Sequence, residues 1–203
     1  QVSSTFSQVK HLSSFAGRES EITIQTCGKF YAANNKQFLY RRGTADGISV
    51  RVKFLDTNPS SSSNMPTVLA VHGSPGNFEE FSHLIERLNA RGCRVIAPNF
   101  PNMSLTDSNH TFYHSTGEKY ELLTDFLAAI GAPSFDLALM HSSGVYPTMK
   151  LWNDKPGSIR SLMMINPAGH RRIKAMKPEW FVSSLARLNM IPIGRWFYEH
   201  LGY

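Results

Sequence analysis

From residue 67 onward, short apolar segments alternate with amphipathic ones, and this alternation constrains the fold more than any other feature of the 203-residue chain. Four segments are mostly apolar, as parallel strands buried on both faces are; they are residues 67–71, 93–97, 135–140 and 161–165. Between them, apolar residues recur at helical spacing. Strands separated by helices indicate βαβ units, so the sequence predicts an α/β fold with a mostly parallel sheet flanked by helices.

Capping signals mark the starts of two of these helices. Asn77 with Glu80, and Ser115 with Glu118, each predict an N-terminus with a capping box. The buried stripes that we expect on the three helices are Phe78, Phe81, Ile85 and Leu88, then Tyr120, Leu123, Leu127 and Ile130, then Val145, Met149 and Trp152.

The two ends of the chain have a different pattern of apolar residues. Residues 21–26 and 49–55 have apolar side chains at every second position, which predicts half-buried antiparallel strands at a sheet edge. Residues 1–18 are polar and predict a flexible arm. After residue 169, two helical patterns follow without an intervening strand. We therefore expect a core at residues 19–169, followed by the start of a helical lid at residues 170–203.

Ser142 lies between an apolar segment and a helical one. At a sharp strand-to-helix turn, a serine hydroxyl stands clear of the sheet on a strained backbone. The main-chain N–H of Ser143 then points from a helix N-terminus toward a developing oxyanion. These features predict Ser142 as a nucleophile. Strand alternation should aim His141 elsewhere, as a packing or hydrogen-bonding residue.

A second motif follows the apolar segment 67–71. Its residues are His72, Gly73, Ser74, Pro75 and Gly76. The glycines permit a tight turn, and the N–H of Ser74 can serve as a second oxyanion donor. The spacing to Ser142 (142 − 72 = 70) fits two βαβ steps of roughly 30 or more residues each. The alternative interpretation is a turn and a helix cap of any α/β protein.

The motifs H-G-S-P-G, R-V-I-A-P-N-F-P, H-S-S-G and I-N-P-A-G, taken together, resemble the α/β-hydrolase superfamily and are similar to a nematode group of α/β-hydrolases of unknown function. The resemblance covers about residues 49 to 169. It implies a nucleophile at Ser142, oxyanion N–H groups at Ser143 and Ser74, and a later acid and histidine that complete a triad. It specifies no substrate.

The sequence departs from the superfamily pattern at three points. Met140 stands where glycine is usual, in a crowded turn. After Ser142, Glu179 with His200 satisfies the order of acid and then histidine, but neither follows a sheet strand. Residues 162–165 are apolar on both faces and would form an exposed hydrophobic edge without a further strand. We therefore expect a fold that is incomplete after its sixth strand, a triad acid and histidine encoded downstream, and no activity of this chain alone.

Composition excludes a few classes of protein. No apolar run is long enough to span a bilayer. The chain is basic (21 − 15 = 6), but it lacks the aromatic and glycine signature of RNA-binding domains, so we expect a solvated surface and no nucleic-acid partner. A weak contact of the basic surface with anionic membranes, or a lid that prefers anionic substrates, is the alternative. Cys27 and Cys93 are typical of a reducing compartment, which favours the cytoplasm, with mitochondria as the alternative.

The leading functional hypothesis is a serine hydrolase that acts on an ester, thioester or amide through an acyl-enzyme. The alternative is a non-catalytic relative that keeps the fold as a ligand-binding or protein-interaction module. We expect no cofactor and no metal, because the pair His110 and His114 lacks carboxylate support and is more typical of a surface. Asn166 favours a turn before proline over a substrate contact.

Overall fold

The computed structural model describes residues 18–41, 43–59, 65–101, 109 and 111–169. The chain divides into two compact units, residues 1–167 and 168–203, and nearly all described residues belong to the first. The predicted arm, except Arg18, and the predicted lid lie outside the described residues.

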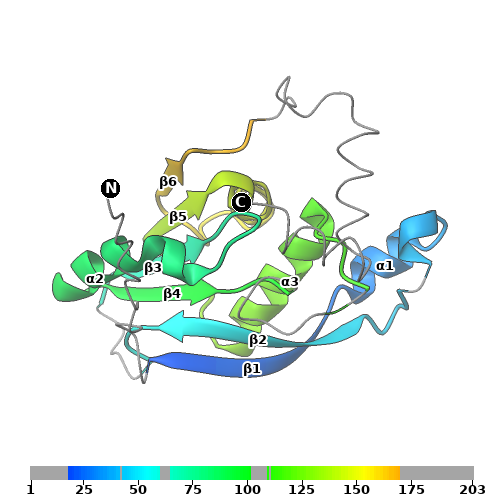
Figure 1. The fold of residues 1–203 in the computed structure, drawn as a ribbon, viewed down its shortest axis with the longest axis horizontal. Helices are drawn as coiled ribbons and strands as arrows, with labels where there is room; N and C mark the ends of the chain where they lie inside the picture. The colour runs from blue at the N-terminus through cyan, green and yellow to red at the C-terminus, as the bar shows by residue number, and fades with distance from the viewer. Residues whose placement is uncertain (1–17, 42, 60–64, 102–108, 110, 170–203) are drawn as a thin grey trace, which may run out of the picture. The chain divides into compact units, whose positions relative to one another are not determined.

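The described strands form one sheet in the order β1-β2-β4-β3-β5-β6 (Figure 1). The pairs β1–β2 and β2–β4 are antiparallel, and the pairs β4–β3, β3–β5 and β5–β6 are parallel. This arrangement confirms the predicted mostly parallel sheet with an antiparallel edge. The strands are β1 (Glu19–Thr26), β2 (Ile48–Asp56), β3 (Thr67–Val71), β4 (Arg94–Pro98), β5 (Leu137–His141) and β6 (Leu162–Ile165).

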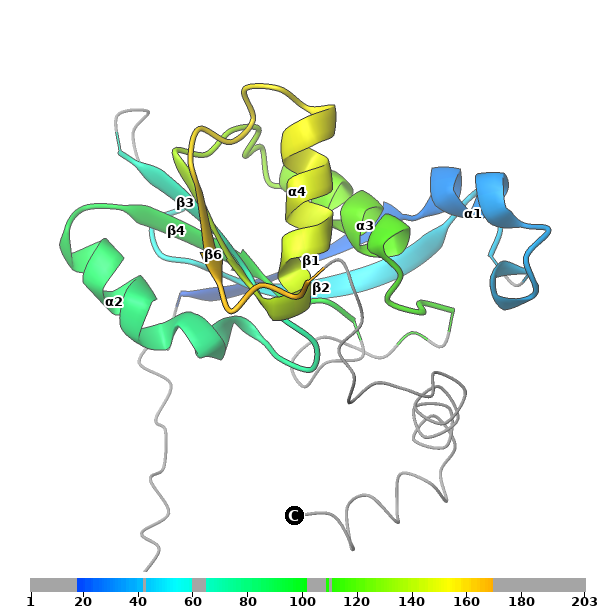
Figure 2. The same ribbon diagram turned by 90° about the horizontal axis from the view of Figure 1, so that it is seen from above.

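Helices cover both faces of the sheet: α2 lies on one face, and α3 and α4 lie on the other (Figure 2). The α-helices are α1 (Gly28–Asn34), α2 (Ser82–Ala90), α3 (Thr116–Ala129) and α4 (Val145–Asp154), and the 3-10 helices are η1 (Phe38–Tyr40), η2 (Phe78–Phe81) and η3 (Ser142–Gly144). The sequence did not predict α1. This seven-residue helix follows Cys27, which has a φ of 64° and contributes no side-chain cap, so the usual start signal is absent.

Alternate residues of the central strands pack on opposite faces. In β3, Val68 and Ala70 belong to the apolar cluster that includes Phe81 and Ile85, from η2 and α2. On the other face, the ring of Phe54 contacts Phe126 of α3, with their centroids 5.0 Å apart. Burial on both faces explains why these strands are continuously apolar in the sequence.

The two predicted capping boxes have different outcomes. Ser115 and Glu118 form the box at the start of α3, as predicted. Asn77 caps η2 by accepting a hydrogen bond from the N–H of Glu79, but the capping box with Glu80 is wrong. The first turn is a 3-10 helix, and the carboxylate of Glu80 is turned toward His141 of β5 instead.

One edge of the sheet is open in the described part of the chain. There β6 pairs with β5 alone, and its Met163 and Met164 are 47% and 45% exposed. This is the apolar edge that the sequence predicts for residues 162–165. None of the helices described is long and apolar enough to cross a membrane.

Candidate active site

The two sequence motifs meet at the carboxyl ends of β3 and β5. These strands are parallel neighbours, and Val71 pairs with Met140 at their last shared position. The loop 72–76 and Ser142 therefore leave the sheet side by side. Ligand-binding sites in α/β proteins form at the carboxyl ends of the parallel strands.

Ser142 occupies the strained position of the turn between β5 and α4. Its φ is 47°, in the left-handed region that non-glycine residues adopt at a cost of about 1–2 kcal/mol. The turn is tight because Gly144 lies against the end of β3: a Cβ there would be 2.5 Å from the carbonyl oxygen of Val71. The side chain of Met140, two residues before Ser142, is fully buried.

Ser142 faces the loop that follows β3. A Cβ placed on Gly73 would be 2.9 Å from the Cβ of Ser142 and 3.2 Å from Nδ1 of His141. Gly73 is thus the residue whose missing side chain lets loop and turn approach. His141 also lies against this glycine, so strand alternation does not carry its ring away from the loop.

His72 is a structural member of the loop. Its Nε2 accepts a hydrogen bond from the N–H of Phe100 at 3.0 Å, so its proton is on Nδ1, which donates to the carbonyl oxygen of Gly73 at 2.7 Å. Burial, more than the nearby Lys119 charge, lowers the pKa of His72 to about 4. A neutral imidazole with both nitrogens engaged is no base for Ser142.

The remaining members of the predicted site lie around Gly73. Ser74 and Pro75 are exposed and joined by a cis peptide bond, and Gly76 lies so close to the carboxylate of Glu80 that a Cβ there would collide with it. Ser143, the first residue after Ser142, is half-buried, and its Oγ has no hydrogen-bond partner within the described ranges. The oxyanion roles of the Ser74 and Ser143 N–H groups stay predictions.

Glu80 connects the turn to the loop. Its Oε2 lies 2.5 Å from Nδ1 of His141 and accepts a hydrogen bond from the N–H of Gly73 at 3.5 Å. This contact makes His141 a hydrogen-bonding residue. Sequence reasoning assigned Glu80 to a helix cap and missed its position beside Ser142.

Lys119 is the other residue that sequence reasoning missed. It is 4% exposed, on the first turn of α3, and its Nζ lies 2.5 Å from Oγ of Ser74 and 5.1 Å from the ring centroid of Phe100. Burial lowers the pKa of Lys119 to about 8. A signal was present, because Lys119 precedes the buried Leu122 and Leu123 at helical spacing and so belongs to the same buried stripe.

The other candidates from the sequence are His114, Asn166 and three residues outside the described ranges. His114 is half-buried, and burial lowers its pKa to about 4, but its partner in the predicted pair, His110, is not described. Asn166 has a φ of 41° and is exposed at the end of β6, as a turn residue would be. Glu179 and His200 also lie outside the described residues.

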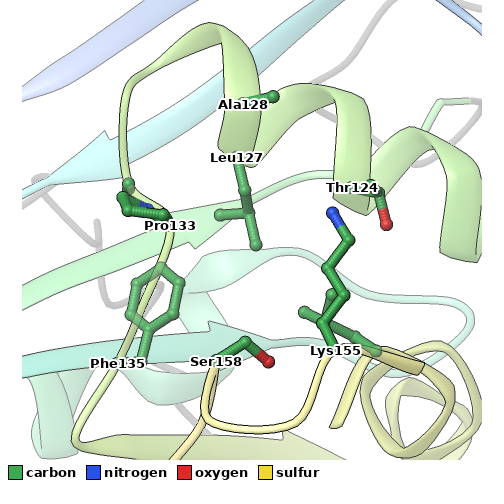
Figure 3. Close-up of a pocket in the computed structure, with 9 residues that line it drawn as sticks. Thr124, Leu127, Ala128, Pro133, Phe135, Lys155 and Ser158 are labelled. Carbon is green, nitrogen blue, oxygen red and sulfur yellow. The ribbon is translucent and has the colours of Figure 1, made fainter. Parts of the chain in front are cut away.

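A small cavity of about 160 Å³ between α3 and α4 is separate from this site (Figure 3). Leu127 of α3 and Phe135, before β5, line it together with Lys155 and Ser158, which follow α4. These residues lie at the amino end of β5 and the far end of α4. The cavity therefore lies near the amino ends of the strands, and Ser142 lies at their carboxyl ends.

Several solved structures share this fold. A carboxylesterase from the ammonia-oxidizing thaumarchaeon Nitrososphaera gargenis has a TM-score of 0.59 and 18% identity, over 71% of this chain and 51% of that one. A probable hydrolytic enzyme from Pseudomonas aeruginosa has a TM-score of 0.60 and 20% identity, over 76% and 51%. A thermophilic esterase from Thermogutta terrifontis has a TM-score of 0.57 and 13% identity, over 84% and 52%.

This chain spans about half the length of these structures. No curated protein matches it. The family model described as "Alpha/beta hydrolase of unknown function (DUF1057)" matches residues 32–195, which is most of the chain. With its mostly parallel sheet flanked by helices, the chain has the α/β-hydrolase fold and belongs to this α/β-hydrolase family.

Proposed function

We propose that the protein is a serine hydrolase that acts on an ester, thioester or amide through an acyl-enzyme, with Ser142 as the nucleophile. The observation that carries the proposal is the backbone of Ser142, whose φ of 47° is held where β5 turns into α4, against Gly73. A strained serine at a strand-to-helix turn is the arrangement that exposes Oγ for attack. The esterases among the similar structures support an ester as the substrate.

In this proposal the main-chain N–H groups of Ser143 and Ser74 hold the oxyanion of the tetrahedral intermediate. Ser143 follows the nucleophile at the start of a helix, and Ser74 follows the glycine that packs on Ser142. Removal of one oxyanion-hole donor from an enzyme of this kind costs about 3 to 4 kcal/mol in the transition state.

The base that activates Ser142 is proposed to come from outside the described residues. His72 has both ring nitrogens engaged. In the described part of the chain, no hydrogen bond joins Ser142 to His141, whose Nδ1 lies against Glu80. Glu179 and His200 have the chain order of a triad acid and histidine, and a longer protein that contains this chain could supply another pair.

The test is labelling by a fluorophosphonate probe in the complete protein that contains this chain. Ser142→Ala should abolish labelling, because the probe reacts with an activated serine hydroxyl. Ser143→Ala is the matched control: it removes the neighbouring hydroxyl, keeps the N–H donor and should keep most of the labelling. Unchanged labelling of Ser142→Ala would refute the role of Ser142, and an unlabelled wild type would favour the non-catalytic alternative.

A further inference from the structure

The Lys119 ammonium is buried, and no carboxylate among the described residues hydrogen-bonds to it. The side chain is 4% exposed, and Oγ of Ser74 is the one hydrogen-bond acceptor that it has within the part of the chain that the structure describes. An ammonium carries three N–H donors. Buried lysines are almost always paired with an acid, whereas Lys119 has no such hydrogen bond within the described residues.

The adjacent acid, Glu118, is already saturated. Its carboxylate accepts hydrogen bonds from the hydroxyl of Tyr31, the N–H of Tyr113, and both the N–H and hydroxyl of Ser115. These contacts tie the Glu118 carboxylate to α1 and to the residues before α3, and none of them involves Lys119.

The other ionisable groups near Lys119 do not neutralise it. Burial lowers the pKa values of His72 and His114 to about 4, and the Lys119 charge lowers them further. Both imidazoles are therefore neutral at pH 7. Among the described residues, Glu118 is the one acid whose charge acts on the pKa of Lys119.

The hydrogen bond between Lys119 and Ser74 has a fixed direction. An ammonium has no lone pair, so Lys119 donates and the Ser74 oxygen accepts. The hydroxyl proton of Ser74 must then point away from Lys119. Ser74 is exposed and follows Gly73, which packs against Ser142. The Ser74 hydroxyl is therefore a polarised hydrogen-bond donor beside the candidate site.

We propose that Lys119 and Ser74 bind the carboxylate of the substrate, so that the protein selects esters whose acyl or alcohol part carries a carboxylate near the reacting carbonyl. The exposed hydroxyl of Ser74 offers a carboxylate one hydrogen-bond donor, and the buried Lys119 charge behind it matches the single charge of a carboxylate. A phosphate dianion would need more donors and charge than this pair provides. The inference rests on the proposed function, in which Ser142 is the nucleophile.

Binding is measured first, without turnover, in a Ser142→Ala background. The probes are monomethyl glutarate, which carries one carboxylate, and dimethyl glutarate, which is neutral, both titrated by isothermal calorimetry. We expect monomethyl glutarate to bind at least tenfold more tightly than the diester. Lys119→Met should weaken its binding by roughly 10- to 100-fold, the value of a charge-assisted hydrogen bond, and leave the diester unchanged.

Two further variants make the binding result specific. Lys150→Met is the matched control, because it removes one positive charge from an exposed lysine on α4 that pairs with Asp154. It should leave the binding of both probes unchanged. Ser74→Ala keeps Lys119 and its charge but removes the hydroxyl, and should weaken monomethyl glutarate by a smaller factor of about 5.

The possible results separate the two proposals. If the Ser142→Ala protein binds monomethyl glutarate equally well with and without Lys119→Met, the carboxylate site is overturned. This result does not depend on whether Ser142 is the nucleophile. In the enzyme with Ser142 intact, an equal fall in kcat/KM for both esters on Lys119→Met would also overturn it, since Lys119 would then serve the reaction and not its selectivity. Lys119-dependent binding together with fluorophosphonate labelling that survives Ser142→Ala would keep the anion site and refute the proposed nucleophile.

Discussion

Removing the charge of Lys119 should stabilise the protein. Burial lowers the pKa of Lys119 from an ordinary 10.5 to about 8. At about 1.36 kcal/mol for each pH unit, the folded state holds this ammonium at a cost of about 3 kcal/mol. Lys119→Met keeps the length of the side chain and abolishes the charge. After about 1 kcal/mol for the lost hydrogen bond to Ser74, we expect the free energy of unfolding at pH 7 to rise by about 2 kcal/mol.

The pH dependence of this gain follows from the direction of the shift. Below pH 8, Lys119 is charged in both states and its cost is fully present. Between pH 8 and 10.5 the unfolded chain binds more protons than the folded one, so wild-type stability rises with pH and the advantage of Lys119→Met disappears.

The assay is urea denaturation followed by circular dichroism at pH 7 and pH 10. Lys150→Met is again the control, because an exposed ion pair such as that of Lys150 with Asp154 contributes little to stability. A Lys119→Met protein that is less stable than wild type at pH 7 would refute the reasoning, because the ammonium would then have a partner that compensates its burial.

Three further outcomes can be measured with the same protein. Gly144→Ala should cost about 1–3 kcal/mol in urea denaturation and reduce fluorophosphonate labelling, because the new Cβ would meet the carbonyl oxygen that ends β3 at 2.5 Å; full stability would contradict the tight turn. Arg94→Met should cost about 3–5 kcal/mol, because it leaves the 5% exposed carboxylate of Asp56 without its two-point partner, and a loss below about 1 kcal/mol would speak against that pairing. Burial raises the pKa of Cys27 to about 12, so brief treatment with iodoacetamide at pH 8 should modify the half-buried Cys93 alone, as peptide mass spectrometry would show.

The core of the fold was predictable because its signals are local. The strands β3 to β6 are apolar on both faces, and the capping box of Ser115 and Glu118 marks the start of α3 directly. The short helix α1 was missed because its first turn has no capping side chain. Its place depends on tertiary contacts, such as the hydroxyl of Tyr31 donating to Glu118, 87 residues away.

The candidate site was predictable only where the backbone itself is special. The glycines at 73 and 144 and the serine between strand and helix are visible in the sequence, because a tight turn restricts the residues that it accepts. The side chains around Ser142 were not predictable. Glu80 contacts His141, which is 61 residues away in the sequence, and Lys119 hydrogen-bonds to Ser74, which is 45 residues away. Sequence rules place charged side chains of helices in solvent and so do not predict either contact.

The methionines of β6 make its outer edge chemically observable. A thioether in contact with water is oxidised by peroxide far faster than one that is packed against protein, and Met163 and Met164 are both open to solvent, whereas Met140 on the neighbouring strand is sealed. The ratio of sulfoxide at positions 163 and 164 to sulfoxide at 140 therefore reports whether any strand, from this protein or another, has docked along that edge. In a longer protein that completes the sheet, the two outer sulfurs should become as resistant as the inner one.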